Sequence, residues 1–89
     1  MDSYANEQGL IAKIGLDIIQ AINHDDISEI QLLFKQLERF NGTVQRRGLK
    51  STVARLETAF VTWQKKNTPN AKGVCLDIAH RLVELDLQD

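Results

Sequence analysis

Apolar residues recur every three or four positions along almost the whole chain. No stretch alternates apolar and polar residues for long enough to indicate a half-buried strand. This periodicity predicts an all-α protein. The apolar stripes and the breaks between them predict four helices, at about 5–23, 26–41, 51–66 and 69–86.

Residues that favour helix starts lie at two of the predicted boundaries. Asp26 precedes Glu29 by three positions, as in a capping box that begins the second helix. Thr68 followed by Pro69 gives the order of an N-cap and a first-turn proline for the fourth helix. Both pairs predict where a helix begins more sharply than the apolar spacing does.

The region between the second and third helices has a weaker pattern. Asn41 and Gly42 predict a left-handed end to the second helix, and Ser51 is the expected N-cap of the third. We therefore expect a loop over residues 42–50. Four helices with short connections predict one domain over residues 1–89, a compact antiparallel four-helix bundle.

Composition adds several expectations about the setting of the protein. The chain has 89 residues, 43% of them apolar, and a net charge of −1, which is typical of a globular domain. The single cysteine, Cys75, cannot form a disulfide within the chain and lies on an apolar stripe, so we expect a small core residue. The acidic and amidated start does not look like a signal peptide, and the apolar run from 10 to 22 is interrupted by charge. We expect a cytoplasmic protein with no membrane segment.

Charge is distributed unevenly along the sequence. The segment 44–66 carries six basic residues and one acidic residue, whereas the rest of the chain is acidic. Arg55 and Lys66 are eleven residues apart and should share one face of the third helix. The basic residues could contact phosphates or an acidic partner, or could simply be solvated: Arg46, Arg47, Lys50, Arg55 and Lys66.

Two nucleic-acid modes fit this segment poorly. Trp63 belongs to the apolar stripe of the third helix, so it should not form a stacking platform for single strands. The expected connection before the third helix is too long for a helix-turn-helix motif. Any nucleic-acid contact should therefore be to phosphates.

Candidates for catalysis and metal binding are few. His24 adjoins Asp25 and Asp26, but helix capping explains these acids. Cys75 and His80 are five residues apart and should point to different sides of their helix. Asp77 and His80 have the spacing of two metal ligands, but no second pair accompanies them. We predict no enzymatic activity, cofactor or metal.

The run Ala79-His80-Arg81-Leu82 resembles the opening of the Ala-His-x-Leu-Lys-Gly signature of histidine phosphotransfer domains, which are also four-helix bundles. The resemblance covers these four residues. Val83 and Glu84 stand where that signature has lysine and glycine. Glu84 in particular replaces the cation that would steady a phosphate, so no family is assigned.

Surplus apolar residues favour a function in binding. The stripes do not account for several large side chains, which are candidates for an interface: Leu16, Ile19, Leu32 and Val61. Small bundles often gain stability by association, so we expect a protein partner or a homodimer. The leading hypothesis is an intracellular protein–protein interaction module that acts as a regulator, adaptor or subunit. The alternative is a nucleic-acid-associated regulator or subunit that contacts phosphates through the basic segment 46–66.

Overall fold

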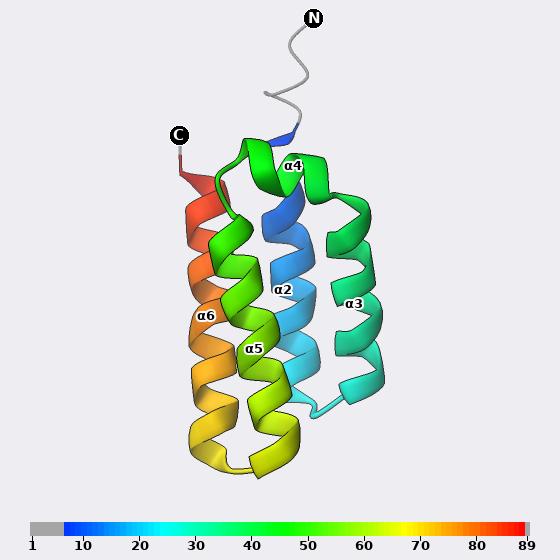
Figure 1. The fold of residues 1–89 in the computed structure, drawn as a ribbon, viewed down its shortest axis with the longest axis vertical. Coiled ribbons are helices and arrows are strands. Elements are labelled where there is room, and N and C mark those ends of the chain that lie inside the picture. Colours follow the sequence, from blue (N-terminus) through cyan, green and yellow to red (C-terminus); the bar gives the residue numbers. More distant parts are fainter. Residues whose placement is uncertain (1–6, 89) are drawn as a thin grey trace, which may run out of the picture.

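The computed structural model describes residues 7–88, and within them every regular element is an α-helix. Four long helices run up and down in sequence: α2 (Leu10–Asn23), α3 (Ile27–Arg39), α5 (Lys50–Lys66) and α6 (Pro69–Leu87). The short helix α4 (Asn41–Arg46) crosses one end of the bundle (Figure 1). The predicted all-α four-helix bundle is thus confirmed. No described helix is both long and apolar enough to cross a bilayer.

Two predicted helix starts are confirmed by their hydrogen bonds. The Asp26 carboxylate accepts a bond of 3.2 Å from the backbone N–H of Glu29, at the start of α3. The Thr68 hydroxyl oxygen accepts one of 3.1 Å from the N–H of Ala71, and Pro69 is the first residue of α6. Ser51, in contrast, is not an N-cap. It lies inside α5, which begins at Lys50 after Leu49.

The loop predicted over residues 42–50 is wrong in its first half, where α4 lies. Gly42 does not end a helix; the chain bends at Phe40 and re-enters a helix at Asn41. The left-handed residue comes later, at Gly48, with a φ of 71°. Burial explains the difference, because α4 and the turn after it bring Val44 and Leu49 onto the open end of the core. The weak apolar pattern of this segment therefore belongs to a short helix and turn that cover one end of the core.

The first predicted helix, 5–23, is interrupted by a turn at residues 8–9. α2 starts at Leu10, directly after Gly9, whose φ of 87° lies in the left-handed region. The predicted start near residue 5 lies outside the described residues. The other long helices agree with the predicted ranges to within two residues.

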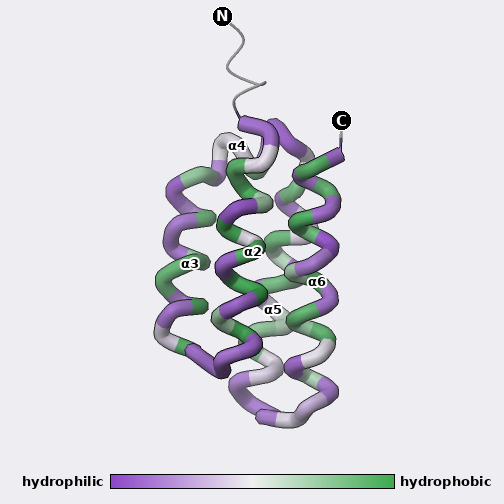
Figure 2. Tube along the Cα trace, turned by 180° about the vertical axis from the view of Figure 1, so that it is seen from behind, coloured by the Kyte–Doolittle hydropathy of each residue, from purple (hydrophilic) through white to green (hydrophobic). Residues whose placement is uncertain are grey.

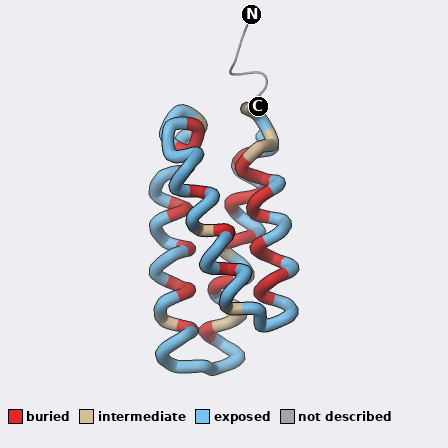
Figure 3. The backbone as a smooth tube through the Cα atoms, turned by 90° about the vertical axis from the view of Figure 1, so that its right-hand side faces the viewer, coloured by how far each residue is buried: buried red, intermediate tan, exposed pale blue. Residues whose placement is uncertain are grey.

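The core lies between the four long helices. Apolar positions form a stripe on each helix (Figure 2), and the buried positions turn inward (Figure 3). Phe60 of α5 links this helix to α3, because its ring centroid lies 5.4 Å from that of Phe34 on α3. Its ring centroid also lies 6.2 Å from that of Trp63 on the same helix. The largest fully buried apolar side chains come from all of these helices and from Leu49, directly before α5: Ile11, Ile18, Ile22, Ile30, Leu56 and Leu82. α2 packs against both α3 and α6, and α6 also packs against α5.

Candidate functional site

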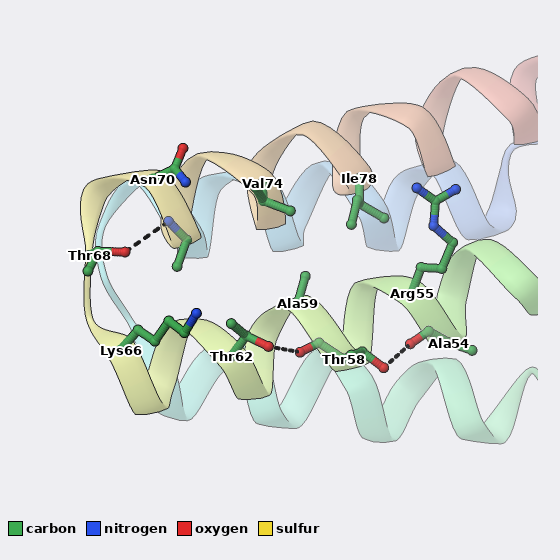
Figure 4. A pocket seen from close by; sticks show the side chains of 11 residues that line it. Ala54, Arg55, Thr58, Ala59, Thr62, Lys66, Thr68, Asn70, Val74 and Ile78 are labelled. Carbon is green, nitrogen blue, oxygen red and sulfur yellow. Dashed lines mark hydrogen bonds between the residues drawn. The ribbon is translucent and has the colours of Figure 1, made fainter.

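A groove with a volume of about 790 Å³ lies between α5 and α6 (Figure 4). It runs along the two antiparallel helices and is open to solvent. Its lining is mostly small or apolar: Ala54, Arg55, Thr58, Ala59, Thr62, Lys66, Thr68, Asn70, Ala71, Val74 and Ile78.

Between Arg55 and Lys66, the α5 wall consists of small side chains, and two of its hydroxyls bond within the helix. The Thr58 hydroxyl donates to the carbonyl of Ala54 at 3.1 Å, and the Thr62 hydroxyl donates to the carbonyl of Thr58 at 3.0 Å. These bonds, four residues back along the helix, use the hydroxyl hydrogens inside α5. This middle part of the α5 wall is therefore shallow and weakly polar, because none of Ala54, Thr58 and Thr62 has a long side chain.

The α6 wall supplies the larger apolar side chains. Val74 and Ile78 lie one turn apart and point into the groove (Figure 4). Val74 is 47% exposed, whereas Ile78 is half-buried. Val74 therefore presents the more exposed apolar side chain of this wall, which a bound ligand would cover.

Two cations stand at opposite ends of this groove. Arg55 lies at the end nearer α4, and Lys66 lies at the end nearer the α5–α6 turn (Figure 4). The predicted common face of these two residues is therefore present, as a wall of the groove. Eleven residues along a helix correspond to about 16 Å. Neither cation forms an ion pair with a described residue, and no carboxylate lines the groove.

The other three basic candidates lie elsewhere. The Arg46 guanidinium donates through Nε to both carboxylate oxygens of Glu7, at 3.1 Å each. Lys50 lines a smaller hollow between α3 and α5, whose lining also includes Glu38 and Glu57. The structure therefore does not bring the five predicted cations onto one surface.

Arg47 forms an ion pair with Asp86, a fully buried carboxylate in the last turn of α6. Arg47 Nε donates to Asp86 Oδ1 at 3.0 Å, and its Nη2 donates to the carbonyls of Asp86 and Gln88. Asp86 Oδ2 accepts a bond of 2.8 Å from the N–H of Ala12, in the first turn of α2. One pair thus joins the start of α2, the end of α6 and the turn after α4. This makes Arg47 a structural residue.

Three of the four apolar interface candidates are exposed, and the fourth is buried. Ile19 is 8% exposed and packs in the core, so its place among the surface candidates is wrong. The first helix buries a broad face because both α3 and α6 pack against it. Leu16, Leu32 and Val61 are exposed, but they come from three different helices and do not line the groove.

The groove itself was not predicted. Val74 and Ile78 belong to the apolar pattern of the last helix, and that pattern does not distinguish a groove wall from the core. A usable signal was present in α5, where Ala54, Thr58 and Thr62 place small residues at four-residue intervals on one face. Such a row lowers a helix surface, but the row alone does not show which neighbouring helix forms the second wall.

The catalytic candidates do not converge. His24 and His80 are exposed, whereas Cys75 is fully buried, so Cys75 and His80 face different sides of α6 as predicted. Burial raises the pKa of the Cys75 thiol to about 11. Among the described residues, no three His, Cys, Asp or Glu side chains are placed to hold a metal ion.

The raised pKa of Cys75 leads to a prediction about pH and reactivity. Because the folded protein favours the neutral thiol, its free energy of unfolding should be unaffected by this group below pH 9.0 and should fall as pH rises from 9.0 towards 11. Near neutral pH, a disulfide reagent should label Cys75 at the rate of unfolding and should label it at once in denaturant. Immediate labelling of the folded protein would contradict the core position.

Comparisons with known proteins find no relative of this chain. No protein-family model matches the chain, and no curated protein or solved structure is significantly similar to it. The function has to be inferred from the groove and its charges.

Proposed function

We propose that this protein is a helical protein–protein interaction module, a regulator, adaptor or subunit that binds a partner polypeptide along the α5–α6 groove. The observation that carries the proposal is the open, apolar groove with Val74 exposed in it. Apolar surface that a partner covers contributes about 25 cal/mol per Å² to association before the entropic costs are counted. Elongated grooves between two helices are a common seat for a partner helix.

The lining of the groove supports binding rather than chemistry. Its only hydroxyls belong to three threonines, and two of these donate to backbone carbonyls within α5. No histidine, cysteine or carboxylate lines it, so a nucleophile paired with a base is lacking at this site. A location in the cytoplasm belongs to the proposal, because the one cysteine is a buried thiol that needs no oxidising compartment.

The placement of the arginines favours a protein ligand over a nucleic acid. Phosphate binding relies on several cations on one surface. Arg46 and Arg47 are bonded to Glu7 and Asp86, and only Arg55 and Lys66 share the groove. Two cations separated by an apolar surface match a polypeptide better than a phosphate backbone.

The proposal is tested by placing a photo-crosslinking amino acid at Val74 and incubating the protein with extract from its own cells. We expect a protease-sensitive adduct from position 74. Leu32 is the matched control, since it is 54% exposed and lies on α3, away from the groove. The same crosslinker at Leu32 should not give this adduct. Unmodified protein should compete for the adduct, and the Val74→Glu variant should not. Equal adducts from both positions, or none from Val74, would refute the proposal.

A further inference from the structure

We infer that the partner in the α5–α6 groove is an acidic amphipathic α-helix that carries two carboxylates eleven residues apart on its apolar face. This inference rests on the proposed function and specifies the ligand. Arg55 and Lys66 give the spacing, because they mark the two ends of the groove and are eleven residues apart on α5. A helix that lies along the groove rises by the same 1.5 Å per residue as α5. Eleven residues are about three full turns, so its two carboxylates point the same way.

The surface between the cations specifies the middle of the ligand helix. Ala54, Thr58 and Thr62 present small side chains, which allow a second backbone to approach closely. Val74 and Ile78 on the other wall present apolar carbons. A ligand residue four or seven positions after the first carboxylate would lie over this surface. We therefore expect apolar residues at these two positions.

Electrostatics favours an acidic ligand over a neutral one. No ion pair with a described residue has to be broken before Arg55 or Lys66 can bind a carboxylate. Arg55 can donate two parallel hydrogen bonds to one carboxylate, and Lys66 acts as a point charge. A neutral helix would cover both cations and offer them no acceptor, at a cost in affinity.

None of the described long helices of a second copy supplies such a pair of carboxylates. α2 carries one acid, Asp17. The two acids of α3, Glu29 and Glu38, are nine residues apart and so lie on opposite sides of that helix. On α6, the exposed acids Asp77 and Glu84 share a side but are only two turns apart. Since α5 has a single acid, the fit favours a partner of different sequence.

The test uses two labelled synthetic helices and the full-length protein. The first helix carries glutamates eleven residues apart with leucines four and seven positions after the first, and the second has glutamine in place of both glutamates. Fluorescence anisotropy should show that the acidic helix binds at least about tenfold more tightly, which corresponds to about 1.4 kcal/mol. Added salt should reduce this difference.

Protein variants test whether Arg55 and Lys66 cause the preference for the acidic helix. Arg55→Gln and Lys66→Gln should each weaken binding of the acidic helix about threefold to tenfold and leave the glutamine helix unaffected. Lys35→Gln is the matched control, because Lys35 is an exposed cation on α3, away from the groove. It should change neither affinity. Circular dichroism confirms that each variant is folded.

Other outcomes separate this inference from the proposed function. If both helices bind equally and Val74→Glu abolishes the binding, the groove is a protein site but the acidic ligand is wrong. If neither helix binds and sedimentation shows a dimer that Val74→Glu dissociates, the occupant is a second copy and the inference is overturned. If neither helix binds and the protein is monomeric, the inference is likewise overturned, and the crosslinking from Val74 decides whether the proposed function stands.

Discussion

Replacing Asp86 by alanine should lower the free energy of unfolding by about 3 kcal/mol. The carboxylate is 0% exposed and is held by Arg47 and by the N–H of Ala12. Its removal leaves the Arg47 side chain, which is only 21% exposed, without its charged partner and leaves an N–H of the first turn of α2 without an acceptor. For a chain of this size, the melting temperature should fall by roughly 15 °C. Urea and thermal unfolding, followed by circular dichroism, measure both quantities.

Glu84→Ala is the matched control for this experiment. Glu84 lies on the same helix, two residues earlier, and is exposed. Its replacement should change the stability by no more than about 0.5 kcal/mol. Asp86→Asn keeps an acceptor for the N–H of Ala12 but loses the charge. Its free energy of unfolding should therefore lie between those of the Asp86→Ala and Glu84→Ala variants. This variant replaces Asp86→Ala in the experiment if the alanine variant does not fold. Equal stability of the Asp86→Ala and Glu84→Ala variants would show that the pair does not join the helix ends.

Local sequence signals predicted the four long helices because each signal acts within one or two turns. The capping residues Asp26 and Thr68 and the apolar stripes need only their near neighbours to be interpreted. The helix α4 could not be predicted in this way. Its six residues have little helical preference, and it forms where Val44 and Leu49 can cover the end of the core. That reason exists only after the other helices have assembled.

The ion pair and the groove were missed for a related reason. Arg47 and Asp86 are 39 positions apart, so Arg47 was interpreted as one of the five basic candidates and no role was predicted for Asp86. The groove depends on the pairing of α5 with α6, which sets Val74 opposite the threonines of α5. The common face of Arg55 and Lys66 was predictable because both residues lie on one helix. The structure shows that α6 forms the second wall of the groove, and that Arg46 and Arg47 are bonded to Glu7 and Asp86 instead of lining the groove.

The contact between α2 and α6 gives the second large expected effect. A side chain at Gly15 would place its Cβ 2.7 Å from Cγ2 of Val83, closer than non-bonded carbons approach. Val83 cannot easily move away, because it is buried and because a β-branched residue in a helix has one preferred rotamer. Gly15→Val should therefore force α2 and α6 apart and cost about 3 kcal/mol, at the upper end of overpacking, although valine is a better helix former than glycine.

Gly73→Val is the matched control for Gly15→Val, since Gly73 also lies in a helix but a Cβ there would have no heavy atom within 4 Å. The same substitution at Gly73 should leave stability unchanged or raise it by up to about 0.5 kcal/mol. Adding Val83→Ala to Gly15→Val should recover at least about 1 kcal/mol relative to the sum of the single losses, because the deleted methyl groups make room for the new ones. Additive losses in the double variant, measured by urea unfolding, would mean that Gly15 is needed for something other than the close approach of α2 to α6.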